Sequence, residues 1–227
     1  MAERKIYEAR LNAGQMLRDR GFALDSRVSD IPFEDFIDRV NGRMMIDMYA
    51  ESDCQDTESK ATISCGESRV YIRFLHSYFG LQKRLQQSTV DKEIATAMNQ
   101  LIDQLQRKES SGSPVRIIFV CEKSPHKNLE GLLPSRYPHV EVLLFDHLQI
   151  NPTRHYLVPR HELLPLDEEG AFLSRINKDI SQARRELPKI ASTDPIVRWC
   201  GFRPGRICKI TRSSEQTGRS IYYRMVI

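Results

Sequence analysis

The sequence predicts an α+β fold made of two domains. One is an α/β domain with a small mixed sheet over residues 1–150, and the other is a smaller α+β domain over residues 151–227. An apolar strand–helix–strand pattern with short connections runs from Val115 to Asp146, which is typical of parallel strand pairing. Beyond it the pattern changes to a helical stretch followed by short strands and glycine turns. We therefore expect a domain boundary near residues 147–152.

The elements of the first domain are predicted from their apolar spacing and their end signals. Residues 4–21 predict a helix that carries an apolar face and stops at Gly21, and residues 29–42 predict a second, short helix. The other expected elements are strands over residues 43–50, 70–79, 115–121 and 140–146 and helices over residues 91–108 and 124–133. Together they form the expected small mixed sheet with its covering helices.

The second domain is expected to contain one long helix, one short helix and a hairpin. Residues 167–186 predict the long helix, with acids in its first turn and arginines in its last. In the short helix, Asp194 is the expected N-cap, Pro195 begins the first turn and Gly201 ends it. The strands are expected over residues 206–212 and 220–227. Because its glycines mark a helix end, a turn and a hairpin, the region is not a phosphate-binding P-loop.

Charge is distributed unevenly along the 227 residues, whose net charge is +4. Residues 1–150 carry 20 Lys and Arg against 22 Asp and Glu, whereas residues 151–227 carry 14 against 8. This positive excess indicates an acidic partner, protein or nucleic acid, for the second domain. No apolar stretch is long enough for a membrane span, so we expect a soluble protein with no membrane partner. The five cysteines lack zinc-finger spacing and are expected to be free thiols.

Three stretches resemble a known family: "INPTRHYLVPRHELLPLDEE", "LPKIASTDPIVRWCGFRPGRICKITR" and "SEQTGRSIYYRMVI". They are similar to the C-terminal domain of the fifth subunit of the eukaryotic nuclear RNA polymerases, which has a small counterpart in the archaeal RNA polymerase. The resemblance covers residues 151–227 closely and the rest loosely. The residues that it implies for partner binding are His155, Pro159, His161, Asp194, Pro195, Arg198, Gly201, Arg206, Arg219, Tyr223 and Arg224.

The resemblance implies a non-catalytic subunit of nuclear DNA-dependent RNA polymerase I, II and/or III. Its N-terminal domain would be a jaw with a degenerate nuclease-like fold, lying near downstream duplex DNA. Its C-terminal domain would be an assembly module that docks on the largest subunit, beside other polymerase subunits. The expected location is the nucleus, or the nucleolus for a subunit dedicated to polymerase I. No catalytic residue, metal, cofactor or small-molecule substrate is expected for this chain.

Four alternatives remain open at this point. A stand-alone nuclease-fold enzyme would need a Mg²⁺ site. Asp47, Glu58 and Lys60 match the sequence pattern of such a site, an acid followed by Glu-x-Lys, although the interpretation of these residues as solvated charges in a loop is favoured. His155 and His161 could form a metal pair, but a structural role is favoured because no third ligand is evident. Trp199 could be an interface anchor, but a core position is favoured. Four cations could meet DNA phosphates or an acidic subunit: Arg203, Arg206, Lys209 and Arg212.

Overall fold

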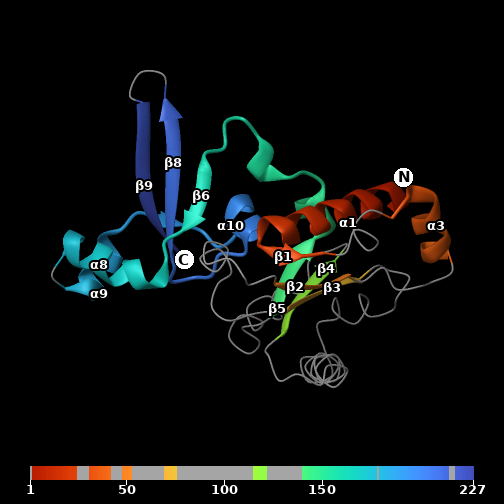
Figure 1. The fold of residues 1–227 in the computed structure, drawn as a ribbon, viewed down its shortest axis with the longest axis horizontal. Helices are drawn as coiled ribbons and strands as arrows, with labels where there is room; N and C mark the ends of the chain where they lie inside the picture. Colours follow the sequence, from red (N-terminus) through yellow and green to blue (C-terminus); the bar gives the residue numbers. More distant parts are fainter. Residues whose placement is uncertain are drawn as a thin grey trace, which may run out of the picture. The chain divides into compact units, whose positions relative to one another are not determined.

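The computed structural model describes residues 2–24, 31–41, 48–52, 69–75, 115–121, 140–177, 179–214 and 218–227 (Figure 1). Contacts divide the described chain into two compact units. The second unit holds Asp19–Gly21 and Asn151–Ile227, and the first holds the other described residues. Both units combine helices with a sheet, so the predicted mixed α+β class is confirmed. Among the described residues, none of the helices has the length and apolarity that crossing a membrane requires.

The first unit is built on a five-stranded mixed sheet of order β1-β2-β3-β4-β5. Its elements are α1 (Ala2–Asp19), β1 (Phe22–Ala23), α3 (Phe33–Asn41), β2 (Met48–Ser52), β3 (Arg69–Leu75), β4 (Val115–Cys121), β5 (Val140–Leu144) and the 3-10 helix η2 (Phe145–Leu148). β2 pairs antiparallel with β1 and β3, whereas β4 pairs parallel with β3 and β5. The expected parallel pairing and the mixed sheet are thus confirmed.

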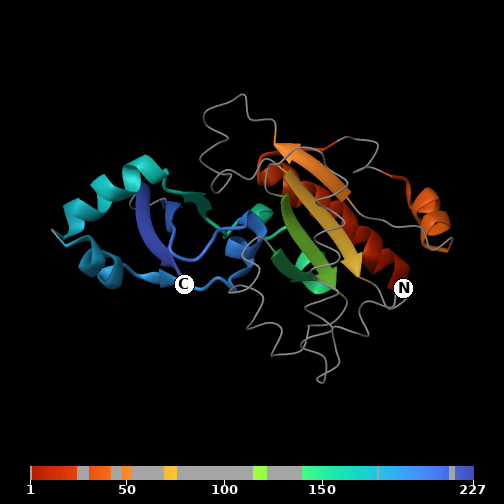
Figure 2. The ribbon, with the colours of Figure 1, turned by 90° about the horizontal axis from the view of Figure 1, so that it is seen from below.

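Helix α1 lies along the five-stranded sheet in both ribbon views (Figures 1 and 2). Its predicted apolar face is buried, with no more than 3% exposure at Ile6, Ala9, Ala13 and Leu17. The Asn12 side chain donates hydrogen bonds to the backbone oxygens of Leu148 (2.7 Å) and Gln149 (3.0 Å), which joins the helix to the end of η2. The helix stops before Gly21, whose φ of 86° suits a residue without a Cβ.

Other predictions for the first unit differ from the structure at their edges. The two-residue strand β1 was not predicted, because so short a segment has no periodicity of its own. Strand β2 extends to Ser52, two residues beyond the expected end, and the 140–146 segment turns into η2 at Phe145. The helices expected over 91–108 and 124–133 lie outside the described residues.

The second unit is built on a four-stranded sheet of order β6-β8-β9-β7. Its elements are η3 (Pro152–Arg154), β6 (Arg160–Leu163), α8 (Leu166–Ile176), α9 (Ile180–Glu186), β7 (Lys189–Ile190), α10 (Pro195–Cys200), β8 (Ile207–Ser214) and β9 (Gly218–Val226). β8 pairs antiparallel with β6 and β9, and β7 pairs parallel with the last residues of β9. The long pair β8–β9 is therefore the centre of this sheet.

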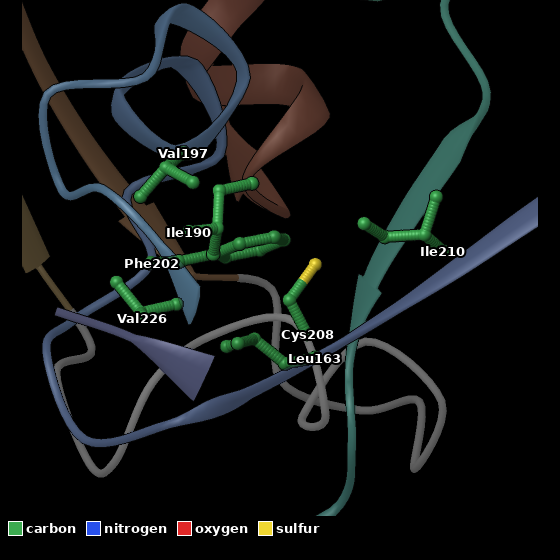
Figure 3. Close-up of a cluster of buried hydrophobic side chains, with 7 residues drawn as sticks. All are labelled: Leu163, Ile190, Val197, Phe202, Cys208, Ile210 and Val226. Carbon is green, nitrogen blue, oxygen red and sulfur yellow. The ribbon is translucent and has the colours of Figure 1, made fainter. Parts of the chain in front are cut away.

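Two apolar clusters lie on opposite faces of this second sheet. One contains Leu163, Ile190, Val197, Phe202, Cys208, Ile210 and Val226 (Figure 3). The other contains Leu164, Leu173, Ala183, Leu187, Ile207 and Met225, with Tyr223 packed against it. Consecutive residues of β9 therefore enter different clusters, as strand alternation requires.

The single helix predicted over residues 167–186 is wrong. The structure has two helices, α8 and α9, separated at Asn177, whose φ of −150° is extended. The Asn177 side chain accepts a hydrogen bond from the Asp179 backbone N–H (3.1 Å), and the Asp179 side chain accepts one from Ser181 N–H (2.9 Å). These local bonds end one helix and begin the next, in competition with the apolar periodicity.

Candidate functional site

The short helix α10 begins and ends where local sequence signals place its caps. The Asp194 side chain accepts a hydrogen bond from the Ile196 backbone N–H (2.9 Å), and Pro195 occupies the first turn. Gly201 ends the helix with a left-handed φ of 68°. These three predictions about α10 are confirmed, and they show that Asp194 and Gly201 shape the backbone of this region.

The C-terminal end of α10 is held by residues from the end of α1 that belong to the same unit. The Arg20 guanidinium donates hydrogen bonds to the backbone oxygens of Trp199 (2.8 Å) and Arg198 (2.6 Å). The Trp199 indole N–H donates to the Asp19 carboxylate (2.8 Å). A Cβ at Gly201 would lie 2.8 Å from the Arg20 guanidinium carbon, so glycine also permits this close approach. Trp199 itself is 2% exposed, which confirms the favoured core position.

A buried ion pair joins α8 to the start of β8. Arg206 donates from Nε to the Glu169 carboxylate (2.7 Å) and from a terminal nitrogen to the Leu164 carbonyl oxygen (2.8 Å). Glu169 is 5% exposed and also lies 3.7 Å from the guanidinium of Arg184. Removing either partner of such a pair would leave the other charge uncompensated inside the unit.

The two histidines that could have formed a metal pair have different surroundings. His155 is exposed and stacks on Tyr156, with ring centroids 5.1 Å apart. His161 is half-buried in β6, and its Nδ1–H donates to the Pro159 carbonyl oxygen (2.7 Å). Within the described part of the chain, no three His, Cys, Asp or Glu side chains gather as a metal site would need.

We expect acid to destabilise the protein through His161. Burial lowers the pKa of His161 from its ordinary value of 6.5, an effect that its hydrogen bond to Pro159 and the nearby Asp194 oppose and Arg212 and Arg224 reinforce. Since the unfolded chain then binds the proton more readily than the folded chain, stability falls as the pH drops below about 6.5. Denaturant unfolding between pH 7.5 and 5 should show a smaller decrease for His161→Gln than for the unchanged protein. Equal decreases would contradict this expectation.

The described cysteines are buried thiols. Burial is the main cause that raises the pKa of Cys121 to about 12, of Cys200 to about 11 and of Cys208 to about 12. Thiols with such pKa values carry almost no thiolate near neutral pH and are poor nucleophiles and metal ligands. All three are free, as expected, whereas Cys54 and Cys65 lie outside the described residues.

Strand β9 combines packed and exposed side chains. The ring of Tyr223 packs on Phe172, with centroids 4.2 Å apart. Arg219 and Arg224 are exposed, and Arg224 reaches the Lys189 carbonyl oxygen at 3.5 Å. This strand therefore contributes to the core of the unit and also carries charge on its surface.

Comparison with known proteins decides the family. A family model described as RNA polymerase Rpb5, C-terminal domain, matches residues 150–226. DNA-directed RNA polymerase subunit Rpo5 of Sulfurisphaera tokodaii is 40% identical over 80 residues, which is 35% of this chain and 90% of that protein. The chain belongs to the Rpb5 family. The Rpb5 relative of Caenorhabditis briggsae, named DNA-directed RNA polymerases I, II, and III subunit RPABC1, is 26% identical over 98% of this chain and 96% of its own length. DNA-directed RNA polymerase V subunit 5A of Arabidopsis thaliana is 25% identical over 98% and 88% of the two chains.

The Rpb5 residues named from the resemblance separate into two groups in the structure. Four are exposed and available to a partner: His155, Pro195, Arg219 and Arg224. The others are half-buried or buried: Pro159, His161, Asp194, Arg198, Gly201, Arg206 and Tyr223. Asp194, Gly201 and Arg206 have internal roles in caps and an ion pair. The partner-binding residues therefore remain a prediction, and the four exposed residues are the best candidates among them.

Two structural residues of this Rpb5 chain were not found by sequence reasoning. Arg20 holds α10 from about 180 residues away in the sequence, and no local pattern announces such a contact. Glu169 stands among the acids of the first turn of α8, so it was interpreted only as a dipole partner. Glu169 lies on the buried side of that helix, four residues before Leu173, and this spacing is the signal that could have revealed its buried position.

The nuclease alternative receives no support from the comparisons, since the relatives are named as polymerase subunits. Its candidate metal residues, Asp47, Glu58 and Lys60, lie outside the described residues. Four cations of residues 1–150 that would be expected to meet DNA if this part forms a jaw also lie outside the described residues: Lys83, Arg84, Lys123 and Lys127.

Proposed function

We propose that this Rpb5 chain docks on the largest subunit of a nuclear RNA polymerase through its second unit, Asn151–Ile227, and forms the lower jaw near downstream DNA through residues 1–150. The chain is a non-catalytic polymerase subunit and has other polymerase subunits as partners. The observation that supports the assignment to a polymerase is the similarity of the chain, over 98% of its length, to a subunit named for polymerases I, II and III. The nucleus is the matching location, and the nucleolus would follow for a subunit dedicated to polymerase I.

The assignment of docking to the second unit rests on two observations. The family model covers residues 150–226, and the archaeal Rpo5 relative matches 80 residues that make up 90% of its own length, so we infer that this unit is the common element of the family. The unit also carries the positive excess, since residues 151–227 have 14 Lys and Arg against 8 Asp and Glu. Cations on an assembly unit favour encounter with acidic protein surfaces.

The jaw assignment rests on the mixed sheet of the first unit. We infer that this sheet, with α1 along it, is the degenerate nuclease-like fold that the family resemblance implies. Residues 1–150 carry a net charge of −2, so any approach to DNA depends on local cations rather than on the whole unit.

Affinity purification of the tagged full chain tests the proposed function. We expect the largest subunit of one or more polymerases to co-purify, because the assembly unit forms part of a stable complex. The identity of the large subunits also shows whether this chain is shared or dedicated to one polymerase. The same tagged chain carrying Trp199→Ala serves as a destabilised control. Recovery of no polymerase subunit with the unchanged chain would contradict the proposal.

We further propose that residues 151–227 are a domain that folds on its own and keeps the docking activity. The fragment should unfold cooperatively in denaturant and retain the largest subunit in a pull-down. Because the Asp19 and Arg20 contacts to α10 are lost, we expect a fragment in which residues 17–22 are supplied as a peptide or linker to be more stable. A disordered fragment, or docking that resides only in residues 1–150, would overturn this domain assignment.

A further inference from the structure

One edge of β9 is open over most of its length. The short strand β7 pairs only with Met225 and Val226, and no other described strand pairs with β9 on that side. On the other side, β9 pairs with β8 from Gly218 to Met225. The part of β9 from Gly218 to Arg224 is therefore a sheet edge within the described structure, and Figure 1 shows β9 as the outer strand of the hairpin there. Such an edge is a template for pairing with another chain.

The backbone groups that face this edge follow from the hydrogen bonds at its lower end. Met225 N–H donates to the Pro188 carbonyl (2.8 Å) and Ile227 N–H to the Ile190 carbonyl (2.9 Å), so both point toward β7. Val226 N–H points the other way, to the Arg206 carbonyl (2.9 Å). Because directions alternate along a strand, the N–H and C=O groups of Ile221 and Tyr223 point out of the open edge.

Cationic and large apolar side chains lie on the open strand β9 and on its inner neighbour β8. The described residues of β8 and β9 contain four cations, Lys209, Arg212, Arg219 and Arg224, and no Asp or Glu. Ile221 is 45% exposed and Tyr222 is 51% exposed, with the Arg212 guanidinium 5.6 Å from the Tyr222 ring centroid. Cations alone would serve to repel other strands. The exposed apolar side chains of Ile221 and Tyr222 beside these cations do not protect the edge from pairing, and they are the kind of surface that a bound partner covers.

We propose that an extended acidic segment of the largest polymerase subunit adds to the β9 edge as a further strand, in line with β7. Its backbone would pair with Ile221 and Tyr223, its apolar side chains would cover Ile221 and Tyr222, and its carboxylates would meet Arg212 and Arg219. Backbone pairing supplies affinity in this mode of recognition, and the side chains supply specificity. This inference rests on the proposed docking function and names the surface and the partner chemistry that docking uses.

Ile221→Pro in the full chain tests the backbone pairing. Since the Ile221 N–H points away from β8, proline removes an edge donor without removing a bond of the hairpin, the position at which strands tolerate proline. Ile221→Thr is the matched control, because it removes the same apolar side chain and keeps the N–H. We expect the proline variant to retain the co-expressed largest subunit about tenfold less well than the threonine variant, as for loss of one backbone hydrogen bond. Circular dichroism and denaturant unfolding establish that both variants fold.

The outcomes separate this inference from the proposed function. If the unchanged chain retains no large subunit, the docking function itself fails. If the unchanged chain docks and the two Ile221 variants dock equally well, the strand addition is wrong and the docking function stands. Amide hydrogen exchange of the full chain gives an independent readout that does not depend on a variant. Ile221 and Tyr223 amides should exchange quickly in the free chain and slowly in the complex, and unchanged exchange would overturn the inference.

The charges are tested by Arg212→Glu with Arg219→Glu, against Arg175→Glu on α8 as an exposed control. We expect the double charge reversal to weaken docking at least as much as Ile221→Pro does. The control variant Arg175→Glu should leave docking unchanged. Titration of the full chain with a fluorescent duplex of about 20 base pairs at two salt concentrations tests the other acidic partner, DNA. Strong, salt-dependent duplex binding that the double reversal abolishes, with docking unaffected, would overturn the acidic protein segment in favour of DNA.

Discussion

Replacing Trp199 by alanine is expected to lower the free energy of unfolding of the second unit by about 3–5 kcal/mol, as for other large aromatic side chains removed from a core. The indole is 2% exposed, so its loss leaves a cavity in the interior of the unit. Its loss also leaves the Asp19 carboxylate without the indole N–H that now lies 2.8 Å away. A unit of this size has little more stability than this to lose.

Denaturant unfolding of the full chain, followed at a probe within residues 151–227, measures this loss. Trp199→Phe is the informative control, because it keeps most of the ring and removes the hydrogen bond to Asp19. We expect the phenylalanine variant to be destabilised by less than half as much as the alanine variant. A loss below about 1 kcal/mol for alanine would mean that the indole contributes little to the core, and an interface role would become the better interpretation.

The contrast between α10 and its surroundings shows what the sequence could predict. The ends of α10 depend on interactions within a few residues, Asp194 with Ile196 and the backbone freedom of Gly201, and both were predicted. The hydrogen bond from Arg20 to the same helix joins residues about 180 positions apart in the sequence, and no local pattern encodes it. The break at Asn177 was also local, but its polar side-chain bonds compete with a helical periodicity that continues across it.

The candidate site could be predicted in kind but not in detail. The family motifs identified the second unit, and they mix residues that shape the unit with residues that a partner can reach. Burial separates the two: Gly201 is buried, whereas Arg219 is exposed. Arg206 shows the limit most clearly, since a basic strand predicts a charged surface while its true neighbour, Glu169, lies on a helix 37 residues earlier.

Replacing Glu169 by alanine is the second change with a large expected effect. Removing one partner of a buried ion pair leaves the other charge uncompensated and typically costs about 3–5 kcal/mol. Here the loss would remove the carboxylate at 2.7 Å from Arg206, whose side chain is 12% exposed, and leave the Leu164 carbonyl oxygen as the acceptor of its guanidinium among the described residues. The Ile207 N–H would lose the same carboxylate at 3.4 Å. We expect the second unit to be strongly destabilised in denaturant unfolding and docking to be lost with it.

The double variant Glu169→Leu with Arg206→Met separates the structural role of this pair from a role in docking. Apolar residues of similar volume can replace a buried ion pair at little cost or with a gain in stability, so the double variant should recover most of the stability that Glu169→Ala loses. If Arg206 acts only inside the unit, docking on the largest subunit recovers together with stability. If stability recovers and docking does not, Arg206 also contacts the partner, as the family resemblance implies. A double variant as unstable as Glu169→Ala would instead show that the region depends on the charges themselves, since Arg184 also lies beside Glu169 at 3.7 Å.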